Sequence, residues 1–253
     1  MNAVAPSAAM RETSIAAGTT IPFDAALRFE REMLAAPRTS DPCHSGASMH
    51  LVIWRTHQAL IVPSGMPRIK HFDHAATVMA AQGWPVHERD TGGDVTPQFR
   101  GMLNISMSFT LDDKERNIAA AYGRLTHPVI SFLKDQFGID AYASSVSGAF
   151  CDGAHNIAID GRKLAGTAQR WRLMPELQNQ QRVTRVLGHV ALVCGGDLTS
   201  ALDAVNAFYR ACEIDRMVVG DAHITLGQVI GQAQAEPHRL AQRLAAHLER
   251  LAF

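Results

Sequence analysis

The stretch IAIDGRKLAGTAQR, residues 157–170, is the part of the sequence that decides the fold. Glycine adopts positive φ at little steric cost, so Gly161 suits a tight turn between the apolar run before it and the residues after it. Alternation along the second arm would place Lys163 on one face and Gly166 on the other. The stretch therefore predicts a β-hairpin that carries one lysine among small residues.

Lys163 is the charged group of this hairpin with the most chemical options. The residues Thr167, Ala168 and Gln169 follow it in a segment whose side chains leave room for a ligand. A strand lysine in such surroundings can polarise a carbonyl, pair with a phosphate or, with a depressed pKa, form a Schiff base. The alternative is a solvated surface lysine, and the hairpin alone leaves both open.

Strands and helices are indicated on both sides of the hairpin. Residues 102–111 alternate strictly between apolar and polar side chains, which is the clearest strand pattern in the chain. Further strands are expected at 51–54, 59–62 and 85–88. Apolar residues at helical spacing predict helices over about 21–36, 71–82, 112–137, 198–212 and 235–252. Helices on a mixed sheet, in one domain, fit this order best.

The long helix over 112–137 has recognisable boundaries. Asp112 or Asp113 is the expected N-cap, and Gly138 is the expected C-terminal stop. Pro128 should kink or divide the helix, because proline lacks the backbone N–H that a helix interior uses.

The composition fits a soluble globular protein of 253 residues, 47% of them hydrophobic. Basic and acidic residues balance at 24 each, so the chain has no global field that would draw it to nucleic acid or an anionic membrane. No apolar run reaches the roughly 20 residues that span a bilayer. We expect a flexible N-terminus over 1–20, a single domain over 21–253, a loop at 37–48 and a cytoplasmic location.

The sequence contains four widely separated cysteines without a CxxC pair: Cys43, Cys151, Cys194 and Cys212. This spacing argues against a metal site or a disulfide scaffold. Cys151 lies in the turn-like segment GAFCDG, residues 148–153, where a thiol could be exposed. A nearby cation such as Lys163 would stabilise its thiolate, whereas a buried, inert cysteine is the alternative.

A glycine-rich turn, a histidine and a basic cluster are less specific features. Arg89 offers a donor fork for a carboxylate or phosphate, and Gly92 and Gly93 would let backbone approach a ligand, although an ordinary turn is the alternative. His189 lies in an apolar run, where a hydrogen-bonded core histidine is more usual than a catalytic base. The following basic residues could dock an acidic partner or form a solvated face: Arg162, Lys163, Arg170, Arg172, Arg182 and Arg185.

Taken together, these stretches resemble the catalytic domain shared by lipoate-protein ligases, biotin-protein ligases and octanoyl or lipoyl transferases, over about residues 20–230. The resemblance implies an α/β (α+β) fold of the class II aminoacyl-tRNA synthetase-like type, with a mixed, largely antiparallel sheet flanked by helices. The family's acyl-pocket segment is similar to Arg89, Thr91, Gly92, Gly93, Gly101 and Asn104. Asp94 and Gln98 depart from it, where ligases usually carry a glycine and a histidine.

The segment 161–169 is similar to the family's lysine strand and is the most specific match. By this resemblance Lys163 contacts the acyl carbonyl, and substrate is bound by Gly161, Gly166, Thr167, Ala168 and Gln169. His189 matches the histidine strand of the family and is expected to order the pocket wall. Cys151 stands where cysteine-dependent octanoyltransferases and lipoyl amidotransferases carry their nucleophile.

The resemblance therefore implies transfer of an octanoyl or lipoyl group, through a Cys151 thioester and without a cofactor, to a protein lysine. The implied donor is an acyl carrier protein or a lipoyl-domain protein. The implied acceptor is the lipoyl domain of a 2-oxoacid dehydrogenase or the glycine cleavage H protein. The strand at 102–111 would supply the apolar wall of the pocket through Leu103, Ile105 and Met107.

Three alternatives stay open. An ATP-dependent lipoate or octanoate ligase would use ATP and Mg²⁺ and would not need the thiol. A non-catalytic acyl-binding or acyl-domain-binding protein would keep the pocket without turnover. Biotin transfer uses the same fold, with a glycine-arginine loop that this chain does not clearly carry.

Overall fold

The strands of this computed structural model form two sheets, and the structure describes residues 10–12, 15–36, 49–112, 114–175 and 183–251. The larger sheet has the order β1-β3-β7-β11-β10-β9-β8, with β2 beside β3. Its strands are β1 Met10–Glu12, β2 Thr19–Thr20, β3 Met49–Arg55, β7 Met102–Asp112, β8 Tyr142–Ser144, β9 Asn156–Ile159, β10 Arg162–Leu173 and β11 Val183–Val193. Along this order, each neighbouring pair from β3 through β7, β11, β10 and β9 to β8 is antiparallel. The strands β1 and β2 run parallel to β3.

The smaller sheet has three strands in the order β5-β4-β6. They are β4 Ala59–Pro63, β5 Val86–Arg89 and β6 Thr96–Gln98, with β5 parallel and β6 antiparallel to β4. The expected mixed, largely antiparallel sheet is therefore confirmed. The neighbouring runs at 51–54 and 59–62 are both strands, as expected, but they belong to different sheets.

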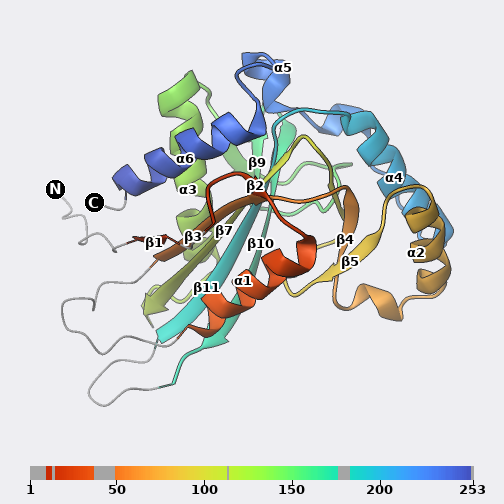
Figure 1. Ribbon diagram of the computed structural model, residues 1–253, viewed down its shortest axis with the longest axis horizontal. Coiled ribbons are helices and arrows are strands. Elements are labelled where there is room, and N and C mark those ends of the chain that lie inside the picture. The colour runs from red at the N-terminus through yellow and green to blue at the C-terminus, as the bar shows by residue number, and fades with distance from the viewer. Residues whose placement is uncertain (1–9, 13–14, 37–48, 113, 176–182, 252–253) are drawn as a thin grey trace.

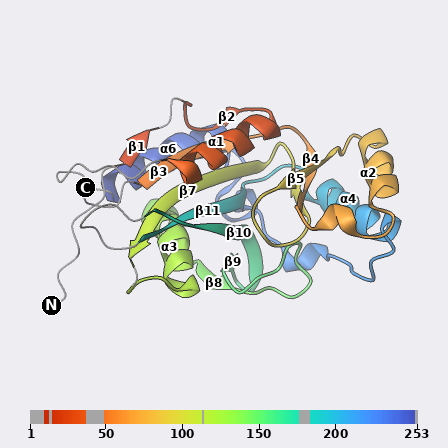
Figure 2. The ribbon, with the colours of Figure 1, turned by 90° about the horizontal axis from the view of Figure 1, so that it is seen from below.

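Helices cover the sheets in separate groups (Figure 1). The helix α1 Phe23–Ala35 lies on one face of the larger sheet, and α3 Ile118–Phe137 lies on the other, as Figure 2 shows. The helix α6 Pro237–Leu251 packs into the same hydrophobic core as α3. The pair α2 Phe72–Ala81 and α4 Leu198–Ala211 packs beside the smaller sheet. Shorter helical pieces are η2 Met66–Arg68, η3 Gly220–Ala222 and α5 Leu226–Ile230.

The alternation along β7 separates two cores. Leu103, Ile105 and Met107 pack with side chains of α3 and α6. The polar side chains between them are buried as well, because α1 covers the opposite face: Asn104, Ser106 and Ser108. Both faces of this strand are thus interior, although its pattern is that of a half-solvated strand.

The expected start of the long helix is wrong, and the helix is not divided. Asp112 is the last residue of β7 and pairs with Val183, so the helix begins only at Ile118, with Asn117 as the N-cap that accepts a hydrogen bond from the Ala120 N–H. Pro128 does not divide α3, because the helix is held by the apolar face that it buries against the sheet. The expected stop at Gly138 is confirmed by its left-handed φ of 69°.

Several expectations fall on the edges of the described structure. The loop at 37–48 and Asp113 lie outside the described residues, as does most of the segment 1–20. Two pieces of that segment are described, residues 10–12 and 15–20, and each contains a short strand beside β3. No described helix is long and apolar enough to cross a membrane.

Candidate functional site

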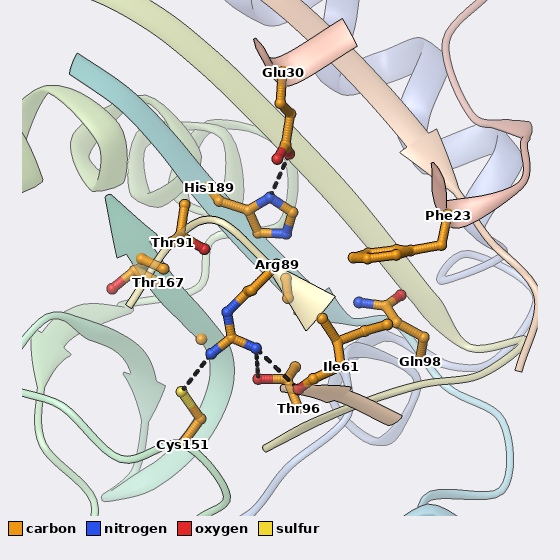
Figure 3. Close-up of a pocket in the computed structure, with 13 residues that line it drawn as sticks. Phe23, Glu30, Ile61, Arg89, Thr91, Thr96, Gln98, Cys151, Thr167 and His189 are labelled. Atoms are coloured by element: carbon orange, nitrogen blue, oxygen red, sulfur yellow. Dashed lines mark hydrogen bonds and ion pairs between the residues drawn. The ribbon is translucent and has the colours of Figure 1, made fainter. Parts of the chain in front are cut away.

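A cavity lies between the smaller sheet and the β10–β11 part of the larger one (Figure 3). Seven of the residues expected at the site line it: Arg89, Thr91, Cys151, Gly166, Thr167, Ala168 and His189. The sequence did not indicate five others: Phe23, Glu30, Ile61, Thr96 and Ala191. The last lining residue is Gln98, which stands where ligases usually carry a histidine. The volume of the cavity is about 30 Å³, which holds about one or two water molecules. Lining side chains must therefore shift before a longer molecule can enter.

The floor of the cavity is formed by paired residues of β10 and β11. Gly166 lies opposite Ala191, and Ala168 lies opposite His189, so their side chains share one face of the sheet. Three of these four side chains are absent or a single methyl group. The small side chains at this part of β10 therefore leave space, as the sequence predicted.

A bulge in β10 overturns the expected alternation around Lys163. The pairing with β9 runs from Lys163 opposite Ala158 directly to Ala165 opposite Ile157, so Leu164 is an extra residue. The bulge places Lys163 and Gly166 on the same face, and a Cβ added at Gly166 would lie 3.3 Å from the Lys163 Nζ. The ammonium is therefore next to the cavity, beneath Gly166, and does not itself line it.

Cys151 occupies a strained turn rather than an exposed one. Its φ is +42°, and only 7% of the residue is exposed, so the expectation of an exposed thiol is wrong. The Sγ accepts a hydrogen bond from the Asp94 backbone N–H at 3.0 Å and one from the Arg89 Nη2 at 3.7 Å. The thiol thus faces a cation and an amide of a loop that lies about sixty residues earlier in the chain. Cys43 lies outside the described residues.

Arg89 does not offer a free fork for a ligand, as the sequence had suggested. Its guanidinium donates to the carbonyl oxygens of Ile61, Gly92 and Asp94. It also reaches the Thr96 hydroxyl at 3.4 Å and the Cys151 thiol. Because a guanidinium has five N–H donors, none remains for a phosphate or carboxylate in this arrangement. Arg89 shapes the 89–96 loop around the thiol.

Gly93 is the residue that lets this loop reach the thiol. Its φ is +104°, and a Cβ at this position would lie 2.7 Å from the Cys151 Sγ. No side chain other than hydrogen fits there. Gly92 has no such constraint, because a Cβ added there meets nothing within 4 Å.

Lys163 holds the backbone on either side of the nucleophile. Its Nζ donates to the Phe150 carbonyl at 2.5 Å and to the Cys151 carbonyl at 2.9 Å. The residue is fully buried, and this burial lowers the pKa of the ammonium to about 8. The ammonium is still mostly protonated at neutral pH, and an ammonium has a third proton to donate.

His223 is a further support of the Cys151 loop that the sequence did not indicate. Its Nε2 accepts a hydrogen bond from the Phe150 N–H at 3.1 Å, and its Nδ1 donates to the Val219 carbonyl at 2.8 Å. The ring also stacks on the Phe150 ring, with centroids 4.9 Å apart. Burial lowers the pKa of His223 to about 4, so the ring is neutral.

The other end of the cavity holds a chain of paired polar side chains. The Trp54 Nε1 donates to the Ser106 hydroxyl at 2.9 Å, and that hydroxyl donates to the Glu30 carboxylate at 2.6 Å. The same carboxylate accepts from the His189 Nδ1 at 2.9 Å. The expectation that His189 orders a wall is consistent with this network, since Glu30 fixes the ring orientation.

The remaining expected residues do not line the cavity. Asn104 and Gln98 exchange two side-chain hydrogen bonds of 2.9 Å, and only Gln98 reaches the cavity. Gly161 forms the hairpin turn with φ of +73°, and Gln169 has a buried Oε1 without a described partner. Leu103, Ile105 and Met107 face the core of α3, so the expected apolar wall is wrong.

The basic cluster at 162–185 does not form one surface. Lys163 and Arg185 are buried, and Arg170 pairs with Asp90 at 2.7 Å. Asp90 also pairs with Arg31, which together with Arg170 lowers the pKa of that carboxyl. Arg182 lies outside the described residues. Within the described ranges, no three His, Cys, Asp or Glu side chains form a group suited to a metal ion.

Comparison with known proteins gives the chain a matching family model and several relatives. Residues 25–242 match the family described as the lipoyl protein ligase A/B catalytic domain. An uncharacterized protein of Cupriavidus necator is 31% identical over 189 residues, which are 72% of either chain. An octanoyl-[GcvH]:protein N-octanoyltransferase of Kyrpidia tusciae is 30% identical over 167 residues, 66% of this chain and 57% of the relative. The match thus spans little more than half of that transferase.

A solved structure has the same fold. Lipoate-protein ligase A bound with ATP superposes with a TM-score of 0.55 at 15% identity, covering 88% of this chain and 95% of that one. At this identity the likeness concerns the fold alone.

Proposed function

The chain belongs to the lipoyl protein ligase A/B catalytic domain family, and we propose that it is an acyltransferase that carries an octanoyl or lipoyl group on Cys151. The group then passes to a lysine of a lipoyl-domain protein. One observation carries the proposal: the Cys151 Sγ lines the cavity and accepts hydrogen bonds from Arg89 and the Asp94 N–H. Such donors stabilise a thiolate, which is the nucleophilic form of cysteine.

The transfer has two steps, and in each step the acyl carbonyl carbon exchanges one bond for another. The thiolate attacks the carbonyl of an acyl-lysine amide on the donor, the C–N bond breaks, and the donor lysine leaves after taking up one proton. The lysine amine of the acceptor then attacks the thioester, the C–S bond breaks, and the amine gives up one proton as the thiolate leaves. With an acyl carrier protein as donor, the first step breaks a C–S bond instead and releases the carrier thiolate. Either donor already holds the acyl group in a bond that is exchanged, so the transfer needs no ATP.

The cations near the thiol suit the charge that develops in both steps. Lys163 uses two protons on the Phe150 and Cys151 carbonyls, and its third is the donor that we assign to the oxyanion. Such a donor acts best when it is fixed before the reaction. The two carbonyl contacts hold the ammonium in place.

The partners follow from the same chemistry. The donor is an octanoyl- or lipoyl-loaded carrier, such as an acyl carrier protein or a GcvH-type lipoyl-domain protein. The acceptor is the lysine of another lipoyl domain. The name of the Kyrpidia relative, which pairs octanoyl-GcvH with a protein, supports a partner of this kind.

The test is intact mass of the purified protein after incubation with octanoyl-GcvH or octanoyl-acyl carrier protein. The wild type should gain one octanoyl group that hydroxylamine removes, and Cys151→Ala should gain none. Cys212→Ala is the matched control, because Cys212 is also buried but lies outside the cavity, and it should be acylated like the wild type.

Two results would overturn the proposal. If no donor loads Cys151, but ATP with free octanoate or lipoate modifies a lipoyl domain, the chain is an ATP-dependent ligase. The saturated guanidinium of Arg89 argues against that reading, because it has no donor left for a phosphate. If the protein binds an acyl domain and neither assay gives a product, it is a non-catalytic binding protein.

A further inference from the structure

The segment 212–219, which joins α4 to η3, touches both loops that form the thiol site. Its Val219 N–H donates to the Gly148 carbonyl at 2.9 Å, at the start of the turn that carries Cys151. Its Arg216 forms an ion pair with Asp94, whose N–H points at the thiol. One segment therefore connects the nucleophile turn with the loop that donates to the nucleophile.

The segment itself is anchored on α4. The Asn206 side chain accepts from the Val218 N–H at 2.8 Å and donates to the Val218 carbonyl at 2.9 Å. The Ile214 N–H donates to the Tyr209 carbonyl at 2.9 Å, and the Arg216 guanidinium lies 5.8 Å from the centre of the Tyr209 ring. These contacts give Arg216 a fixed base from which to hold Asp94.

Asp94 is tied on three sides, and its N–H is the part left to face the thiol. Its carbonyl accepts from the Arg89 Nη2 at 2.7 Å, and its Oδ1 accepts from the Val95 N–H at 2.7 Å. Its Oδ2 is bound by Arg216. The preceding residue, Gly93, has wide backbone freedom, so the direction of this N–H depends on what holds Asp94.

We propose that the Asp94–Arg216 ion pair is a latch that aims the Asp94 N–H at Cys151, which makes both residues positioning residues for the nucleophile. Neither side chain reacts. The latch acts by keeping the 3.0 Å contact between this N–H and the Sγ, which favours the thiolate. Its effect on acyl transfer rests on the proposed function, whereas its effect on the thiol does not.

The test uses two readouts on Arg216→Ala. The first is the single-turnover rate of Cys151 acylation by a small octanoyl thioester, measured by intact mass over a range of thioester concentrations. The second is alkylation of Cys151 by iodoacetamide, followed by peptide mass to separate this thiol from the others. Both rates should fall about tenfold, because a hydrogen bond to a charged group is lost or misdirected. The thioester concentration at half-maximal rate should stay unchanged.

Two matched variants separate aiming from general support. Lys70→Ala removes an exposed ion pair to Glu213, which lies on the segment 212–219. This variant should leave both rates unchanged. Arg216→Lys keeps the charge and should restore most of the loss. A thermal unfolding midpoint of Arg216→Ala close to that of the wild type shows that the fold is retained.

The outcomes decide the latch independently of the proposed function. The latch is overturned if a folded Arg216→Ala variant is alkylated and acylated as fast as the wild type. It is also overturned if Lys70→Ala loses as much of both rates as Arg216→Ala does. If the wild type accepts no acyl group from any donor, the proposed function fails. The latch then stands or falls on alkylation, which requires only a reactive thiol.

Discussion

The two ends of the cavity are built in opposite ways. At the thiol end, the turn of Cys151 lies against Arg89 at the end of β5 and Lys163 near the start of β10. In the described part of the chain, neither cation is paired with a carboxylate. At the other end, regular strands and α1 hold His189 and Ser106 against Glu30, so that the carboxylate is hydrogen-bonded within the protein. Buried cations without a carboxylate favour an anion nearby. The thiol end is therefore suited to a thiolate or an oxyanion, and the other end is suited to holding a ligand without reacting.

Lys163→Met should have the largest effect of four substitutions that test this comparison. It removes the donor assigned to the oxyanion, and we expect the single-turnover acylation rate to fall about a hundredfold to a thousandfold. The pH profile gives a second check. The ammonium is present below its pKa of about 8, so the wild-type rate should decline as pH rises through 8. That decline should be missing in Lys163→Met, and an unchanged rate would contradict the role of the ammonium.

Gly93→Ala should rank second, because its Cβ would collide with the Cys151 Sγ and its φ is unfavourable for alanine. A displaced loop should slow acylation about a hundredfold. Gly153→Ala is the matched control in the turn of Cys151, since a Cβ there meets nothing within 4 Å. Intact-mass measurements at a series of quenched reaction times give the acylation rates of both variants. Equal rates in the two variants would show that the close approach of the loop is not needed.

Glu30→Ala should act at the other end of the cavity and affect binding more than reaction. The Ser106 hydroxyl and the His189 Nδ1 would lose their acceptor, which should destabilise the fold by about 1–3 kcal/mol in urea unfolding. The donor concentration at half-maximal rate should rise about tenfold, while alkylation of Cys151 stays as in the wild type. Glu30→Gln keeps a side-chain oxygen as acceptor, so its donor concentration at half-maximal rate should lie between those of the wild type and Glu30→Ala. Slower alkylation in Glu30→Ala would mean that the two ends are not independent.

His223→Gln should have the smallest effect, and only in acid. The folded pKa of His223 is about 4, below its ordinary 6.5, so the unfolded chain binds a proton that the folded chain does not between these values. The stability of the wild type should therefore be complete above pH 6.5 and be lost as pH falls towards 4, by about 1–2 kcal/mol at pH 5. Glutamine can still accept from Phe150 and does not titrate. Urea unfolding at pH 7 and pH 5 should show that the free energy of unfolding falls less between these pH values in His223→Gln than in the wild type.

The sequence predicted the long elements well, because their side chains repeat over many residues. The strand at 102–111 and the helices at 71–82 and 198–212 correspond to β7, α2 and α4. It did not indicate β6 or α5, which have three and five residues and are too short for a repeat to show. It also placed a helix start at Asp112, because it could not tell that β11 extends far enough to pair with that residue.

For the site, the sequence by itself determined which reactive groups are present and on which segments: a cysteine in a turn, a lysine on a hairpin and an arginine before two glycines. These follow from local patterns. Only the tertiary structure decided that Arg89 and Asp94 serve the thiol, that Lys163 holds the nucleophile turn through a bulge, and that His189 faces Glu30. Such contacts join segments far apart in the chain, and their geometry is set by strand register and backbone φ, which the order of residues alone does not show.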